Sequence, residues 1–196
     1  MTALRRFGLL APLAAFSLAG CGLNSVPTAE EQVNAKWANV QNEYQRRNDL
    51  IPNLVGAVKG AANQEKSVLV EVTNARANAN KIQLSPGDLD DPVKVRNFND
   101  AQNQVTMSLQ RLQEAYPELK TNENFLTLQS QIEGTENQIR VARMDYNEAV
   151  QAYNTRIRTF PDAIGAKIFY GAKPKVPFEA AAGAQSAPKV DFGNAS

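Results

Sequence analysis

Charged side chains on otherwise apolar helical faces are the residues of this chain most able to do chemistry. When the apolar spacing that leads to Tyr44 is extended, Arg47 falls on the inward side. Glu136 and Arg143 lie on or beside the inner stripe of the last long helix. A buried charge is costly unless it is paired and hydrogen-bonded. The spacing therefore predicts a structural polar network of Arg47, Glu136, Asn137 and Arg143 that fixes the register between helices.

Two other roles stay open for the same region. One is a solvated face, on which the arginine stems merely cover apolar surface. The other is a small-ligand or lipid site in a gap between helices near Arg46, Arg47 and Asp49. A deep pocket lined by those residues would favour the ligand site. A filled seam would favour a protein that binds partners along its surface.

The residue types present argue against catalysis. The chain of 196 residues has no histidine, and so lacks the usual general base and the commonest metal ligand. Its one cysteine, Cys21, permits no internal disulfide. Lys and Arg number 21 against 20 Asp and Glu, a balance that gives no bulk attraction to nucleic acid. We expect no enzyme, no cofactor and no nucleic-acid partner.

Asp88, Asp90 and Asp91 form the one acidic cluster of the sequence. Hard cations such as Ca²⁺ need several oxygen ligands, and no loop of calcium-binding spacing follows the cluster. Asp91 precedes Pro92 and is suited to cap a helix that begins there. We therefore predict no metal site at this cluster.

The N-terminus has the three parts of an export signal. Arg5 and Arg6 precede an apolar run from Phe7 to Ala19, which is too short for the roughly 20 residues that a membrane-spanning helix needs. The run ends in Leu18-Ala19-Gly20-Cys21, which resembles the lipobox of bacterial lipoproteins. The resemblance implies a diacylglycerol on the Cys21 sulfur, cleavage after Gly20 and acylation of the new amine.

Two alternatives to lipidation are an uncleaved short anchor and ordinary cleavage that leaves Cys21 as an incidental thiol. Three acyl chains together would tether the protein firmly, whereas one is marginal. In lipoproteins of cells with two membranes, aspartate after the cysteine retains the protein at the inner membrane. Gly22 stands at that position here, which favours the outer membrane.

Apolar residues recur at helical spacing from residue 28 to residue 160. Thr28 and Glu31 have the form of a capping box, and the stripe that follows fits one long helix or two placed end to end. Pro52 predicts a kink or break near residues 48–52. A second helix begins after Asp91 and ends near Tyr116, and a third runs from about Thr121 to Phe160.

These patterns predict an all-α fold, an elongated antiparallel bundle of three to four long helices without a central sheet. The expected core includes four aromatic residues at helical spacing, Trp37, Tyr44, Tyr146 and Tyr153. The alternative is a membrane-surface patch near Trp37. The expected organisation is a signal peptide at 1–20, a lipidated tether at 21–27, the bundle at 28–160, a fold-back segment at 161–178 and a disordered tail at 179–196.

Several motifs follow one another along the helices. The most specific is Trp37 followed by the run from Tyr44 to Val55, which contains Arg-Arg-Asn-Asp-Leu-Ile-Pro-Asn-Leu-Val. The others are Ala75-Arg76, Tyr116 to Lys120, Glu136 to Ile139, Ala142 to Asn147, Tyr153-Asn154, Phe160-Pro161 and Pro188 to Phe192. Together they resemble the LemA family of bacterial envelope proteins. The resemblance implies an α-helical bundle that faces away from the cytoplasm and is attached to a membrane by its N-terminus. Many members use a membrane helix where this chain has a lipobox.

The family resemblance supplies no reaction. We expect a non-enzymatic, lipid-anchored envelope protein that binds other envelope proteins or organises the membrane surface. The alternative is a small-ligand or lipid-binding envelope protein.

Overall fold

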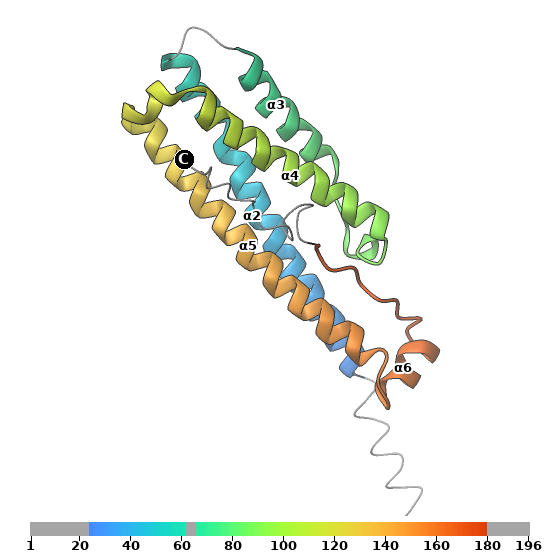
Figure 1. The fold of residues 1–196 in the computed structure, drawn as a ribbon. Helices are drawn as coiled ribbons and strands as arrows, with labels where there is room; N and C mark the ends of the chain where they lie inside the picture. Colours follow the sequence, from blue (N-terminus) through green and yellow to red (C-terminus); the bar gives the residue numbers. More distant parts are fainter. Residues whose placement is uncertain (1–23, 62–65, 180–196) are drawn as a thin grey trace, which may run out of the picture.

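The chain folds into a bundle of antiparallel helices, shown in Figure 1. The computed structural model describes residues 24–61 and 66–179. The all-α prediction is confirmed, and the described residues contain no strand. The elements are α2 (Ser25–Ala61), α3 (Lys66–Lys81), the 3₁₀ turn η1 (Pro86–Asp88), α4 (Pro92–Ala115), the 3₁₀ turn η2 (Pro117–Thr121), α5 (Glu123–Arg156) and the short α6 (Asp162–Ile168).

The two longest helices, α2 and α5, lie side by side along most of their length, while α3 packs against α4 (Figure 1). Successive helices α2, α3, α4 and α5 reverse direction, so α3 turns back rather than continuing α2. The start of α2, the end of α5 and α6 lie together at one end of the molecule, which we call the basal end.

The first helix begins earlier than predicted, at Ser25 instead of after Thr28. Thr28 is inside the helix, and its hydroxyl donates to the carbonyl of Asn24 at 2.7 Å. The predicted capping box is therefore wrong. Pro27 falls in the first turn, where its missing N–H costs little. Burial of the Val26 side chain stabilises the extra turn. The lipobox and Cys21, from Leu18 onward, lie outside the described residues, as do residues 180–196.

Of the kink or break predicted near residues 48–52, the break does not occur, because α2 continues through Pro52 to Ala61. A proline inside a helix leaves the carbonyl four residues earlier without its usual donor. That carbonyl belongs to Asn48, and it accepts a hydrogen bond from Arg76 Nε on α3 at 2.8 Å. Ile51 and Leu54, on either side of the proline, are buried. A side chain from the neighbouring helix thus replaces the backbone donor that Pro52 lacks.

The caps of the later helices follow from local sequence. The Asp91 carboxylate accepts from the amides of Val93 and Lys94, and Pro92 is the first residue of α4, as predicted. The Asn122 side chain accepts from the Phe125 amide at the start of α5. These bonds satisfy amides that a helix N-terminus otherwise leaves without partners.

The core consists of two apolar clusters. The basal one gathers rings from three elements and the C-terminal segment: Trp37, Phe98, Tyr146 and Phe178. The upper one contains Ile51, Val72, Val105 and Phe125. Trp37, Tyr44, Tyr146 and Tyr153 are all buried, so the prediction that these aromatics are core residues is confirmed.

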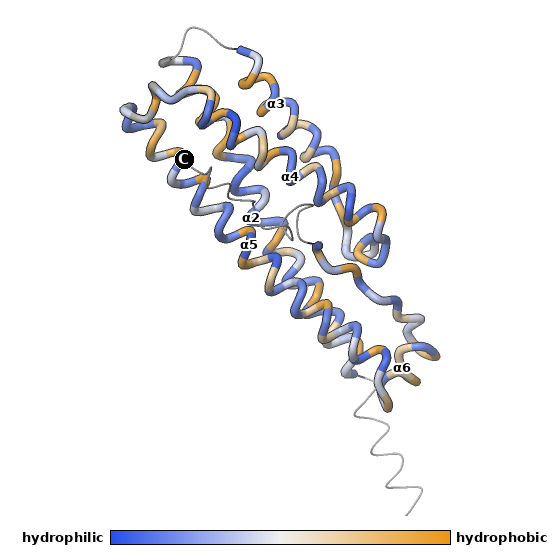
Figure 2. Tube along the Cα trace, in the orientation of Figure 1, coloured by the Kyte–Doolittle hydropathy of each residue, from blue (hydrophilic) through white to orange (hydrophobic). Residues whose placement is uncertain are grey.

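Hydrophobic and hydrophilic residues alternate along every helix rather than forming one apolar stretch (Figure 2). Among the described residues, no helix is both long and apolar enough to cross a membrane.

Candidate functional site: a buried arginine beside a surface groove

Arg47 lies in α2 between the two apolar clusters, next to Tyr44 of the basal cluster and Ile51 of the upper one. Its side chain is 1% exposed. Its Nη1 donates to Glu136 Oε1 on α5 at 2.8 Å, and the Glu136 side chain is 29% exposed. A buried guanidinium keeps its charge, so a close carboxylate is what makes the position tolerable.

Two residues of α4 complete the arginine's partners. Nη1 also donates to Thr106 Oγ1 at 2.9 Å, and Nη2 donates to Gln102 Oε1 at 2.6 Å. The Thr106 hydroxyl in turn donates to Glu136 at 3.2 Å. Arg47 therefore joins α2, α4 and α5 through one polar layer. Nothing in the sequence spacing of Gln102 identified it as an arginine partner.

Tyr44 adds an aromatic contact to this layer. The Arg47 guanidinium lies 5.1 Å from the centre of the Tyr44 ring, within cation–π range. Burial raises the pKa of the Tyr44 hydroxyl, and the positive charges of Arg143 and Arg47 partly oppose that rise. Tyr44 is thus held neutral beside the buried charge.

The structure brings together only part of the predicted network. Arg47 and Glu136 are in direct contact. Asn137 is exposed and accepts from Arg140 on its own helix. Arg143 donates to the Glu179 carbonyl at 3.0 Å, and its guanidinium lies 4.6 Å from the centre of the Phe178 ring. Asn137 faces outward because it follows Glu136 by one residue, about 100° around the helix.

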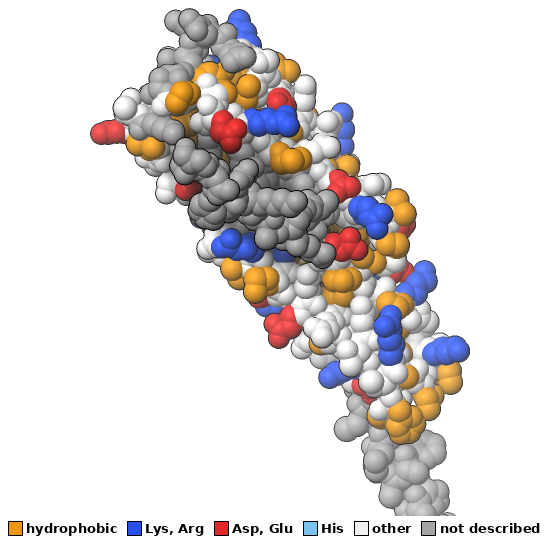
Figure 3. Space-filling view, in the orientation of Figure 1, with side chains coloured by type: hydrophobic (Ala, Val, Ile, Leu, Met, Phe, Trp, Pro, Cys, Tyr) orange, Lys and Arg blue, Asp and Glu red, His pale blue; other side chains and the backbone are white. Residues whose placement is uncertain are grey.

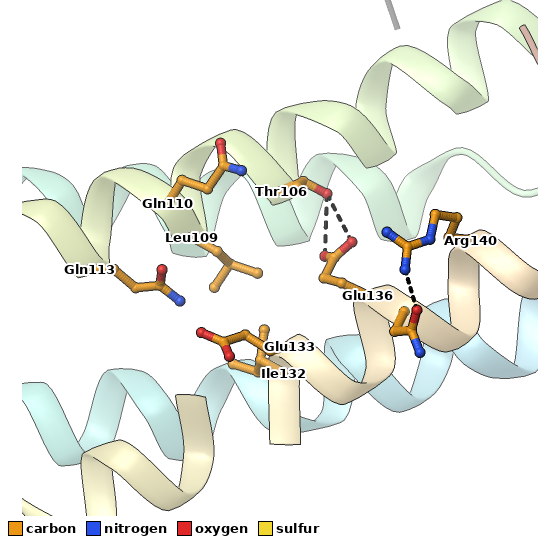
Figure 4. Close-up of a pocket in the computed structure, with 9 residues that line it drawn as sticks. Thr106, Leu109, Gln110, Gln113, Ile132, Glu133, Glu136 and Arg140 are labelled. Atoms are coloured by element: carbon orange, nitrogen blue, oxygen red, sulfur yellow. Dashed lines mark hydrogen bonds between the residues drawn. The ribbon is translucent and has the colours of Figure 1, made fainter. Parts of the chain in front are cut away.

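A groove of about 610 Å³ opens between α4 and α5 beside this layer (Figure 4). Leu109 and Ile132 provide its apolar surface. Polar side chains surround them: Thr106, Gln110, Gln113, Glu133, Glu136, Asn137 and Arg140. In Figure 4, Gln110 and Gln113 project from α4, and Glu133, Glu136 and Arg140 project from α5. The Thr106–Glu136 hydrogen bonds join α4 to α5 within this lining (Figure 4), so the buried arginine helps to position part of the groove's wall.

The ligand gap considered near Arg46, Arg47 and Asp49 does not form as one pocket. Arg47 is buried and occupied by its partners, whereas Arg46 and Asp49 are exposed on the helix surface. Asp49 accepts from Gln45 Nε2 at 2.7 Å. At this level the Arg47 guanidinium and its partners occupy the space between α2, α4 and α5.

The acidic cluster is used structurally. Asp88 accepts from Ser85 and Lys94, and these hydrogen bonds hold its pKa well below the usual range. Asp90 pairs with Lys173 at 3.2 Å, and Asp91 caps α4. Within residues 24–61 and 66–179, no group of three or more His, Cys, Asp and Glu side chains is placed to hold a metal ion.

Sequence reasoning missed how the C-terminal segment is held. Residues 175–178, which we call the strap, have no regular secondary structure and run along the bundle (Figure 1). Asn154 and Asn147, seven residues apart on α5, each bind both backbone groups of one strap residue. The Asn154 side chain donates to the Lys175 carbonyl and accepts from the Lys175 amide, both at 2.8 Å. The Asn147 side chain donates to the Phe178 carbonyl at 3.0 Å and accepts from the Phe178 amide at 2.8 Å. The seven-residue spacing of the two asparagines, which places them on one face of α5, was the available signal.

The strap also closes the basal core. Phe178 is 6% exposed and lies with its ring 5.3 Å from that of Tyr146 and 5.9 Å from that of Trp37. The Val176 amide donates to the Leu89 carbonyl at 2.8 Å. The predicted fold-back segment therefore ends in residues that belong to the core.

These features define an all-α protein, a bundle of four long antiparallel helices stabilised by a buried polar layer and closed by a C-terminal strap. The chain belongs to the LemA family, which it matches over residues 36–192. It is also similar to Protein LemA of Metamycoplasma hominis, with 23% identity over 137 residues, or 70% of this chain and 60% of that protein. The chain thus spans about three-fifths of that relative's length. LemA is not known as a family of enzymes.

Proposed function

We propose that this chain is a non-enzymatic, lipid-anchored protein of the bacterial cell envelope that binds another envelope protein through the groove between α4 and α5. The observation that carries the proposal is the groove itself, which has an apolar floor at Leu109 and Ile132 and a rim of amides and charges. Such a mixed, open surface suits a peptide or helix of a partner, for which a few anchors in an apolar groove supply affinity and the rim supplies selectivity.

The packing of the polar layer favours a partner over a small ligand. Arg47 fills the space between α2, α4 and α5 where a ligand would have to enter. What remains is a hollow on the outside of the bundle, bounded by two long helices. A protein segment can follow such a groove, whereas a small molecule gains little enclosure there.

The membrane attachment in this proposal rests on the sequence. The apolar run that ends at Cys21 supports export and lipidation, with Leu18, Ala19 and Gly20 as the lipobox and Gly22 favouring the outer membrane. Metabolic labelling with an alkyne fatty acid should mark the wild-type chain, and Cys21→Ser should abolish the label. Label that persists in Cys21→Ser would contradict lipidation at this residue.

The partner site is tested by photo-crosslinking in the cell. A photoreactive amino acid replaces Gln110 at the rim of the groove and, as the matched control, Asn39 on the exposed side of α2. We expect a discrete heteromeric product from position 110, and little or none from position 39. Mass spectrometry identifies the partner. The Cys21→Ser background shows whether the contact needs the anchor.

Three outcomes decide the proposal. A product specific to position 110 that weakens when Arg140 is changed to Glu supports partner binding in the groove. Equal products from both positions would contradict the site. Products that contain this chain alone would contradict a heteromeric partner.

A further inference from the structure

Four large apolar side chains are exposed at the basal end, in the segment that includes α6. Phe160 is 82% exposed, Ile168 69%, Phe169 66% and Ile164 53%. We call these four residues the apolar tip. Ile164 and Ile168 are one helical turn apart, so they share a face of α6. Gly165 and Ala166 are buried. The helix therefore turns small residues inward and large apolar residues outward, the reverse of what a packed helix in water requires.

Basic side chains accompany the apolar tip in the same stretch of sequence. Arg158 and Lys167 are exposed, and the Lys173 side chain is 75% exposed although it pairs with Asp90 at 3.2 Å. Asp162 is paired with Arg156 at 3.7 Å, and its side chain is 18% exposed. Figure 3 shows hydrophobic side chains gathered at the end of the molecule where α6 lies, with lysine and arginine side chains beside them. Apolar groups flanked by exposed cations are the composition of a surface that contacts anionic lipid.

The apolar tip lies where the N-terminal segment joins the bundle. Arg156 Nη1, at the end of α5, donates to the Ser25 carbonyl at 3.2 Å, and α6 contacts α2. The predicted lipid site, Cys21, is four residues before Ser25. Four residues span at most about 14 Å even when fully extended. A lipid on Cys21 would hold the basal end within that distance of a bilayer.

We propose that the apolar tip inserts into the interfacial layer of a bilayer containing anionic phospholipid, forming a second membrane contact beside the N-terminal lipid. The four apolar side chains enter the boundary between headgroups and acyl chains, and Arg158 and Lys167 meet phosphate groups. This inference rests on the proposed lipid anchoring for its geometry, and it adds a site that the anchor alone does not require. Two contacts would orient the bundle on the membrane, whereas a single point of attachment would leave its tilt and rotation free.

The test places an environment-sensitive fluorophore at the apolar tip. Ile168→Cys is labelled with a nitrobenzoxadiazole dye in the full chain, purified from its membrane and reconstituted into vesicles of phosphatidylethanolamine and phosphatidylglycerol. Lys59→Cys, exposed near the opposite end of α2, is the matched control. The parent chain is labelled in parallel to measure any reaction at Cys21. Circular dichroism checks that each variant is folded.

We expect a blue shift and strong quenching by shallow lipid-borne quenchers for the dye at position 168, and neither for the dye at position 59. Phosphatidylcholine vesicles should give a smaller shift, as should the Arg158→Glu/Lys167→Glu variant in anionic vesicles. A dye at position 168 that remains in water while the protein floats with the vesicles would overturn the inference and leave the anchor intact.

Two further results bear on the same inference. Failure of the chain to float with vesicles would contradict the anchoring, and a shift at position 168 caused by adding vesicles to Cys21→Ser would still support the apolar tip. A blue shift that appears without vesicles and grows with protein concentration would assign the apolar tip to a second copy of the chain and overturn the lipid contact.

Discussion

Arg76 on α3 donates through Nε to the backbone carbonyl of Asn48 on α2 at 2.8 Å. This is the carbonyl that Pro52, four residues later, cannot serve. Asn48 also donates through its side chain to Asn80 on α3 at 2.8 Å. Pro52 thus leaves the Asn48 carbonyl without a donor from its own helix, and Arg76 of α3 supplies one. This hydrogen bond joins α3 to α2 at a defined residue.

Arg76→Met should lower the free energy of unfolding by about 1–2 kcal/mol, because it removes the donor to a partly buried carbonyl and keeps most of the apolar stem. In a Pro52→Ala background the same change should cost less, since residue 52 then supplies an amide to Asn48. Chemical denaturation of the four proteins in this double-mutant cycle measures the coupling. Equal losses in the two backgrounds would show that Arg76 does not compensate for Pro52.

Arg47→Ala should be the most destabilising single change in the polar layer. It leaves Glu136, Gln102 and Thr106 without their cation and opens a cavity, at a cost of roughly 3 kcal/mol. For a chain of this size that corresponds to a fall in Tm of roughly 6–12 °C. Arg46→Ala, one residue away on the exposed side, is the control and should have little effect. A Tm for Arg47→Ala within error of the control would exclude a structural network.

Asn154→Ala should loosen the strap at Lys175, and Asn147→Ala should loosen it at Phe178. Each substitution removes two hydrogen bonds, worth roughly 1–2 kcal/mol in total. Amide hydrogen exchange at residue 175 or 178 should accelerate about tenfold for each 1.4 kcal/mol lost. Exposed Asn137→Ala serves as the control. Unchanged exchange at both amides would mean that the other contacts of the strap, among them the Val176–Leu89 hydrogen bond and the packing of Phe178, hold it without the two asparagines.

Alkaline pH should destabilise the protein through its buried tyrosines. Burial, followed by the charges of Glu30 and Asp90, raises the pKa of Tyr153 to about 12. The unfolded tyrosine ionises near pH 10, about two units lower. The unfolded chain therefore loses its proton first, and stability falls as pH rises from 10 through 12.

Tyr153→Phe should flatten this fall while leaving stability near pH 7 almost unchanged. The comparison requires urea denaturation of both proteins at several pH values, and ultraviolet titration follows phenolate formation. Identical alkaline slopes for the two proteins would show that Tyr153 ionises normally in the folded state.

The helices could be predicted from the sequence because their signals are local. The 3–4 spacing of apolar residues, the Asp91-Pro92 cap and the aromatic core positions each depend on neighbours within a turn or two. The early start of α2 and its continuation through Pro52 have tertiary causes. Pro52 is tolerated because Arg76 lies on another helix, and α2 begins early because Val26 is buried against the bundle.

The site was less predictable than the fold. The seam placed Arg47 and Glu136 inward, and the structure brings their charged groups together. Gln102 and Thr106 come from α4, and they reach Arg47 only at one axial position of α4 relative to α2. The periodicity of the sequence does not determine that position. Arg143 interacts with the strap, whose path follows from bonds to Asn147 and Asn154 rather than from a pattern of its own.

The continuity of α2 sets the height of the groove above the basal end. From Ser25 to the Arg47 layer, an unbroken helix measures about 33 Å at 1.5 Å per residue. With the base held at a membrane, a partner's docking segment would have to reach that same level. Seven residues added to both α2 and α5 below the layer would lift the groove by about 10 Å without turning it away from its original side. The length of α2 and α5 would then select partners whose docking segment lies at the same distance from the membrane as the groove.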